Sequence, residues 1–188
     1  MAKLLGGTRI YGTAIIDTSL AISGSGASAS TSTTTGAVTV VGGAGIGGDV
    51  YVGGNVYLPN RPAFRVIGNG GNISNGATLT ATNWVMDFQQ GTALNTSTGI
   101  FTAPVAGLYQ VNLVMRVWSN TSATISQAIV YKNATVATML EFGVNSTMNH
   151  AGVSTVAKLA IGDTLKTVVA VGTLSFDSND NWSVAFIG

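Results

Sequence analysis

From residue 63 onward, apolar and polar residues alternate along short segments that end in Asn, Gly, Ser or Asp. The longest alternation places Tyr109, Val111, Leu113, Met115 and Val117 on one face of a single strand. No segment shows sustained helical periodicity. The pattern predicts strands at residues 63–67, 77–81, 84–88, 108–118, 123–131, 134–142, 148–159, 164–173 and 182–187. Many strands at short spacing predict an all-β sandwich or barrel.

Residues 1–60 have a different texture, because 13 of the 25 glycines separate short apolar segments there. Apolar residues recur at a spacing of six near the end of this block, at Val40, Ile46, Val52 and Leu58. Such short strands cannot bury both faces within one chain, so we expect several copies to wind into an intertwined, trimeric β-shaft. Pro59 and Pro62 end the repeat. We therefore predict a base and shaft at residues 1–60 and a head at residues 61–188.

Charged residues make up 8% of the 188 residues and hydrophobic residues 46%. An ordinary soluble domain carries about 25% charged residues, so this composition favours a subunit of a larger assembly. The formal net charge of +1 excludes the basic footprint of a nucleic-acid-binding protein. No apolar run is long enough for membrane insertion, and Gly6 and Gly7 interrupt the start before a secretion signal forms. The chain has no cysteine, which excludes disulfides and thiolate metal sites.

The patterns that suggest enzymatic chemistry are incomplete. Gly43 to Gly48 spell G-x-G-x-x-G, but a strand-like segment follows where a dinucleotide site needs a helix. His150 is the only histidine, and no acidic residue lies near it in sequence, so we interpret it as a strand or interface residue. Asp87 and Glu141 could face each other as in a glycosidase, yet nothing in the sequence requires it. We expect no enzyme activity, no cofactor and no metal site.

Two polar loops are candidates for ligand contact. Residues 177–181 are rich in oxygen atoms but lack the glycine and the distal glutamate of a calcium loop. We interpret them as a solvated turn, with a weak cation site at a trimer tip as the alternative. Trp118 and Asn120, where a strand leads into a polar loop, form the candidate glycan contact. For the tryptophan, packing in the core or at an interface is the interpretation that we favour.

One segment resembles the signature of the complement C1q-like domain, a relative of the tumour necrosis factor fold. In that family a G-x-F-x-x-P-x-x-G-x-Y-x-F/V segment enters the central strand of a jelly roll. The matching residues here are Gly99, Phe101, Pro104, Gly107, Tyr109 and Val111. The resemblance continues through residues 62–66, 131–133, 159–165 and 182–187. No acidic cluster marks the calcium site that some members carry.

This resemblance implies a jelly-roll β-sandwich that packs as a tight homotrimer. The signature residues of the fold and of the trimer core are then Phe64, Phe101, Pro104, Gly107, Tyr109, Val111 and Phe186.

Residues 42–57 resemble the repeats that precede the tips of bacteriophage fibres and tail appendages. We therefore expect a trimeric structural protein on the virion surface of a tailed phage, made in the host cytoplasm. We favour a capsid decoration, or cement, protein that reinforces the shell. Its N-terminal region would contact the major capsid protein or other virion proteins. The alternative is the receptor-binding tip of a short tail fibre that recognises a host-surface glycan. We expect neither a nucleic-acid partner nor membrane insertion.

Overall fold

The computed structural model describes residues 38–56, 58, 61–119, 125–142 and 147–188. The chain divides into two units, Met1–Asn55 and Val56–Gly188. The described residues of the second unit form strands and turns. Across the described ranges, no helix is long and apolar enough to cross a membrane. The predicted all-β architecture is confirmed.

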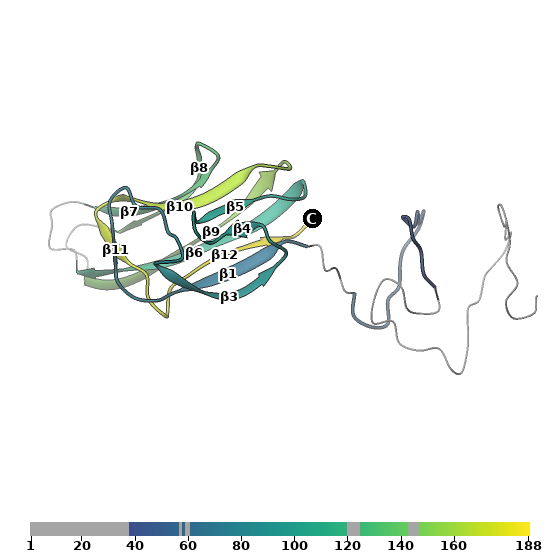
Figure 1. Ribbon diagram of the computed structural model, residues 1–188, viewed down its shortest axis with the longest axis horizontal. Coiled ribbons are helices and arrows are strands. Elements are labelled where there is room, and N and C mark those ends of the chain that lie inside the picture. The colour runs from purple at the N-terminus through teal and green to yellow at the C-terminus, as the bar shows by residue number, and fades with distance from the viewer. Residues whose placement is uncertain (1–37, 57, 59–60, 120–124, 143–146) are drawn as a thin grey trace, which may run out of the picture. The chain divides into compact units, whose positions relative to one another are not determined.

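The second unit is a sandwich of two antiparallel sheets (Figure 1). Sheet A has the order β2-β11-β6-β12-β1-β3. β11 and β12 pair with successive parts of one edge of β6, and β9 pairs with its opposite edge. Sheet B has the order β4-β5-β10-β7-β8. The strands are β1 (Ala63–Gly68), β2 (Asn72–Ser74), β3 (Trp84–Gln90), β4 (Leu94–Asn95), β5 (Ile100–Thr102), β6 (Gly107–Ser119), β7 (Ser126–Lys132), β8 (Thr135–Phe142), β9 (Thr147–Leu159), β10 (Thr164–Val171), β11 (Thr173–Ser175) and β12 (Asn181–Phe186). The chain crosses repeatedly between the sheets, which is the jelly-roll topology.

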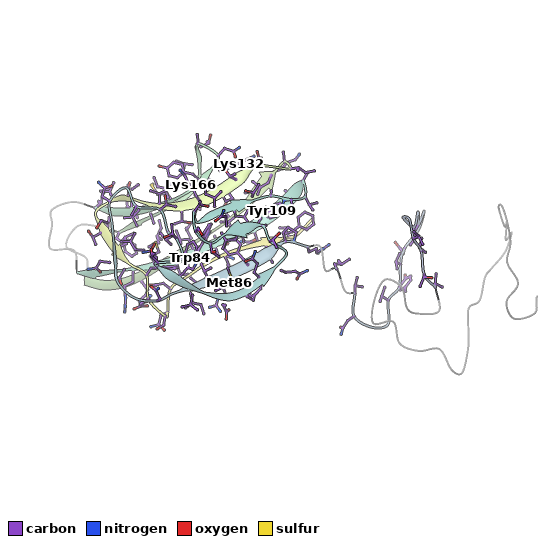
Figure 2. The ribbon with its side chains drawn as sticks, viewed as in Figure 1. Trp84, Met86, Tyr109, Lys132 and Lys166 are labelled. Atoms are coloured by element: carbon purple, nitrogen blue, oxygen red, sulfur yellow. The ribbon has the colours of Figure 1, made fainter. Side chains whose placement is uncertain are left out.

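Each sheet buries one face because alternate residues along its strands are apolar. Tyr109, Val111, Leu113 and Met115 of β6 are fully buried, as the alternation predicts. Figure 2 shows Tyr109 and Trp84 between the two sheets. The core therefore lies between sheet A and sheet B, and the opposite face of each sheet carries the side chains available for contact.

Aromatic rings from both sheets join the core. The Phe64 and Trp182 rings meet edge to face with centroids 4.8 Å apart. The ring centroids of Phe101 in sheet B and Tyr109 in sheet A lie 5.6 Å apart, and those of Tyr109 and Phe186 lie 5.3 Å apart. Such pairs contribute about 0.5–1.5 kcal/mol each beyond their buried area. The aromatic residues of the signature therefore hold the two layers of one chain together.

The turn that leads into β6 depends on Gly107. A Cβ atom at this position would collide with the Gly188 carbonyl oxygen and lie 2.5 Å from the Phe186 ring. The Tyr109 hydroxyl donates a 2.6 Å hydrogen bond to the Val105 carbonyl oxygen and so closes the turn from within. The glycine is required here by the close approach of the last strand rather than by chain flexibility.

Most predicted strands exist, with ends that differ by a few residues. The predicted strand at residues 77–81 is wrong, because this segment contributes only an isolated bridge between Thr78 and Val168. The short strands β2, β4 and β11 were not predicted, since two or three residues are too few to show an alternating pattern.

In the first unit, residues 38–55 contain bends and no strand. The predicted strand and glycine-turn repeat is therefore not formed by these residues in the single chain. Val41 is 107% exposed and Tyr51 93% exposed. The physical reason is that short apolar segments between glycines have no second layer to pack against. The intertwined shaft of several chains stays a prediction, and residues 1–37 lie outside the described part.

Candidate functional site

One candidate site is the outer face of sheet A, formed by the residues that alternate with those of the core. The register places Arg65, Ser183, Asn112 and Ser154 in one row across β1, β12, β6 and β9. We define the outer face of sheet A by its members Ala63, Arg65, Ile67, Val85, Phe88, Gln110, Asn112, Val114, Ser154, Val156, Ser183 and Ala185.

Amides and hydroxyls form a hydrogen-bonded ladder in the middle of this face. Gln110 Nε2 donates to Ser154 Oγ at 2.5 Å and to Asn112 Oδ1 at 3.3 Å. Asn112 Nδ2 donates to Ser183 Oγ at 3.2 Å. The ladder joins β9, β6 and β12 without using a charged group. Because its members already bond to one another, another surface can cover the ladder at a lower desolvation cost than isolated amides would impose.

Apolar side chains flank the ladder and are exposed in the single chain. Val85 is 60% exposed, Phe88 49% and Val156 52%. Arg65 Nη1 lies 2.9 Å from Asp87 Oδ2, so the charges beside these residues neutralise each other. Exposed apolar groups with little net charge are typical of the core of a protein–protein interface. The outer face of sheet A therefore has the chemistry of an assembly surface.

A cluster of charged groups lies at the end of β1 opposite Pro62. Arg116 of β6 and His150 of β9 are cross-strand neighbours, and Asp177 and Asp180 belong to the loop between β11 and β12. Arg116 forms an ion pair with Asp177. His150 Nδ1 lies 3.3 Å from Asp180 Oδ1. We call these four residues the Asp180 cluster.

The prediction of a solvated turn at residues 177–181 is wrong for Asp180, which is only 1% exposed. Its Oδ2 atom accepts a 2.8 Å hydrogen bond from the Asp177 backbone N–H. Burial raises the pKa of Asp180 to about 6, although the nearby charges of His150 and Arg116 act in the opposite direction. No local pattern indicates this contact, because His150 lies on β9 and Asp180 lies in the loop between β11 and β12. Within the described part of the chain, no three His, Asp or Glu side chains gather to hold a metal ion.

A second polar network clamps the β7–β8 turn to the loop before β10. Asp163 accepts hydrogen bonds from Asn133 Nδ2 and from the Ala160 backbone N–H, each at 2.9 Å, and its Oδ2 lies 3.0 Å from Lys132 Nζ. These partners, Asn133 foremost, lower the pKa of Asp163 to about 2. Asn133 has a φ of 53°, which asparagine tolerates in tight turns. Every group is held by its neighbours, so this network is structural.

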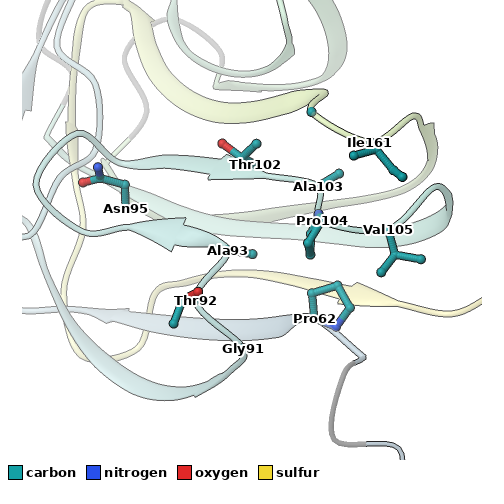
Figure 3. A pocket seen from close by; sticks show the side chains of 11 residues that line it. Pro62, Gly91, Thr92, Ala93, Asn95, Thr102, Ala103, Pro104, Val105 and Ile161 are labelled. Carbon is teal, nitrogen blue, oxygen red and sulfur yellow. The ribbon is translucent and has the colours of Figure 1, made fainter.

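An open pocket of about 600 Å³ lies beside Pro62, where the head begins (Figure 3). Its lining consists of Pro62, Gly91, Thr92, Ala93, Asn95, Thr102, Ala103, Pro104, Val105, Ile161 and Gly162. The polar side chains among these residues are uncharged. The pocket therefore supplies no acid, base or nucleophile pair of the kind that catalysis needs.

Comparison with known proteins places the sandwich in a family. The model of the C1q domain matches residues 75–187. This chain belongs to the C1q domain family. Among curated proteins, none matches the chain.

Solved structures share the fold of this C1q domain at low sequence identity. Eiger TNF from S. frugiperda superposes with a TM-score of 0.54 and 15% identity over 68% of this chain and 93% of its own. Murine APRIL at pH 5.0 superposes with a TM-score of 0.52 and 12% identity, over 68% of this chain and 100% of its own. The globular domain of zebrafish complement 1qA superposes with a TM-score of 0.51 and 17% identity, over 69% of this chain and 98% of its own. At these identities the likeness shows the fold alone.

The signature residues occupy the interior and one end of the C1q domain. Phe64, Phe101, Tyr109 and Val111 are at most 1% exposed in the core of a single chain. Phe186 is half-buried, with the Arg61 guanidinium 5.6 Å from its ring centroid. Pro104 and Gly107 form the turn into β6. Any contribution of the signature to a trimer core stays a prediction, and the deeply buried members can act only through the shape of their own sandwich.

The remaining candidate residues are not brought together. Asp87 pairs with Arg65 beside the outer face of sheet A, whereas Glu141 lies on β8 of sheet B and accepts a 2.5 Å hydrogen bond from Gln127. The two carboxyls therefore do not face each other across a cleft. Asn120 and the side chain of Trp118 lie outside the described residues, so the candidate glycan contact stays a prediction.

Proposed function

We propose that this C1q-domain chain is a homotrimeric structural protein on the surface of a virus particle, namely a capsid decoration protein of a tailed bacteriophage. In this proposal the N-terminal region contacts the major capsid protein or its neighbours, and the C1q head points outward. The protein acts by geometry: it ties neighbouring capsid subunits together and so reinforces the shell.

The observation that carries the proposal is the row of exposed apolar side chains before the head. Each of the following is at least 45% exposed in the single chain: Val38, Val40, Val41, Ile46, Val50, Tyr51, Val52, Val56 and Leu58. Burial of apolar surface stabilises a protein by roughly 25 cal/mol for each Å² removed from water, and these residues do not gain that free energy in the single chain. Partner chains can bury these residues, whereas glycine-separated segments of one chain cannot build a core of their own.

The outer face of sheet A supports assembly of the heads. Phe88 and Val85 are exposed near one edge of this face and Val156 near the other, with the uncharged ladder between them. A closed three-fold arrangement would bury this face in each copy and leave no unsatisfied surface. The low charge of the chain, 8% of residues, agrees with a subunit whose surface is largely covered.

The trimer is tested by native mass spectrometry of the full chain. We expect a species of about 57 kDa, three times the 19.0 kDa chain. Phe88→Glu places three charges in the proposed interface and should shift the population towards monomer. Met139→Glu is the matched control, because Met139 is similarly exposed, at 45%, on sheet B. A monomeric wild-type chain, or equal effects of both variants, would refute this interface.

The location is tested by quantitative mass spectrometry of purified virus particles. Hundreds of copies per particle, near a multiple of the three-fold sites of the shell, would support decoration. A few to a few tens of copies would instead indicate a tail fibre and redirect the search to a host-surface glycan. Absence from particles would overturn the virion assignment while leaving the trimer untouched. If decoration is correct, shells that lack the protein should also rupture at lower temperature.

A further inference from the structure

The Asp180 cluster contains a buried carboxylate that its surroundings satisfy only in part. Asp180 Oδ2 accepts the hydrogen bond from Asp177 N–H. Asp180 Oδ1 is buried and has no hydrogen-bond partner with good geometry among the described residues, although His150 Nδ1 lies 3.3 Å away. An ionised carboxylate in this position lacks much of the solvation that water would provide. A proton on either member of the pair would relieve this deficit.

The charges around Asp180 come from three elements. His150 belongs to β9, Arg116 to β6, and Asp177 to the same loop as Asp180. Arg116 is engaged by Asp177, so its charge is already largely offset. With neutral His150 the four residues carry a net charge of −1, and one added proton brings them to zero.

The loop that carries Asp180 closes one end of the sandwich. The Asp180 carbonyl accepts a hydrogen bond from Gly68 N–H at 3.3 Å, and the Phe176 carbonyl accepts one from Gly70 N–H at 3.0 Å. Phe176 itself is fully buried. Movement of this loop would therefore release the end of β1 and uncover an aromatic side chain of the core. The cluster is the set of side-chain contacts that ties the loop to β6 and β9.

We propose that His150 and Asp180 form a proton-operated latch, which holds the loop at residues 176–180 closed in mildly acidic solution and loosens it at neutral pH. The latch is complete within one chain, so it depends neither on the proposed trimer nor on the virion location.

The direction follows from linkage between proton binding and loop closure. Burial raises the pKa of Asp180 from 3.8 to about 6 when the loop is closed. An open loop exposes the carboxyl to water and restores its ordinary value. The closed state then binds the proton more tightly, so closure is favoured as the pH falls through 6 towards 3.8. From the two pKa values we expect the opening equilibrium to rise about tenfold between pH 5 and pH 7 and to level off above pH 7.

Hydrogen exchange of the full chain, corrected for the intrinsic pH dependence of exchange, measures this equilibrium at the Gly68, Gly70 and Asp180 amides. The wild-type chain should lose about tenfold protection between pH 5 and pH 7. Asp180→Asn removes the titrating group, keeps an oxygen for Asp177 N–H and should give a flat profile. Asp87→Asn alters an exposed carboxyl on the same sheet and should behave as wild type. Equal wild-type protection at both pH values would overturn the latch, and so would an unchanged pH dependence in Asp180→Asn.

A direct titration keeps the proposal testable if Asp180→Asn does not fold. The side-chain carboxyl carbon of Asp180 in the wild-type chain should titrate near pH 6 by NMR. A carboxyl titration near pH 4 would refute the latch, whatever the outcome of the particle and trimer experiments.

Discussion

Removal of the Tyr109 hydroxyl tests whether the signature tyrosine acts through its hydrogen bond as well as its ring. Tyr109 is fully buried, and its hydroxyl donates a 2.6 Å hydrogen bond to the Val105 carbonyl oxygen. Burial raises the pKa of Tyr109, so the hydroxyl keeps its proton and remains a donor. A net hydrogen bond of this kind contributes about 1 kcal/mol, and truncation of a buried aromatic side chain costs about 3–5 kcal/mol. Tyr109→Phe should therefore cost about 1 kcal/mol and Tyr109→Ala several times more.

Urea denaturation, followed by the fluorescence of the buried Trp84 and Trp182, measures both losses. Protein concentration must be held constant, because assembly would add to apparent stability. Tyr131→Phe, on β7, is the control and should change the free energy of unfolding by less than about 0.5 kcal/mol. Equal stability of Tyr109→Phe and wild type would refute a stabilising role for the hydrogen bond between the Tyr109 hydroxyl and Val105. A loss of stability as large as that of Tyr109→Ala would show that the substitution disturbs the packing of the ring, and the loss could not then be assigned to the hydrogen bond.

Two further predictions concern the frame of the head. Gly99 has a φ of 68°, and a Cβ atom there would collide with the Leu79 carbonyl oxygen. Gly99→Ala should therefore lower the free energy of unfolding by more than about 2 kcal/mol. Near-wild-type stability in urea denaturation would contradict this prediction. The partners of Asp163 lower its pKa to about 2, so its contribution to stability is present above pH 3.8 and is lost as the pH falls through 2. Asp163→Asn should therefore flatten the acid unfolding curve below pH 4, as followed by circular dichroism, and an unchanged curve would show that the Lys132 and Asn133 contacts do not stabilise the fold.

The sequence was most informative where a strand is long and has one buried face. The alternation from Tyr109 to Met115 predicted β6 and its buried side, because a period of two can place those residues only on one face of a sheet. The same reasoning failed for residues 77–81, whose apolar residues pack beside β10 without a continuous ladder. Very short strands such as β2 exist only because a neighbour, here β11, supplies their hydrogen bonds. Local pattern contains no information about that neighbour.

By itself, the sequence determined the all-β class, the position of the Pro104–Gly107 turn and the low charge that points to an assembly. These properties depend on local geometry and on composition, which the order of residues states directly. Only the tertiary structure decided that Asp180 is buried beside His150, that Asp163 is held by Asn133, and that the outer face of sheet A carries a polar ladder between apolar edges. Each of these features joins strands or loops that are distant along the chain. Their contacts arise from sheet register and from the crossing of the chain between two layers, and both are set by packing of the whole core.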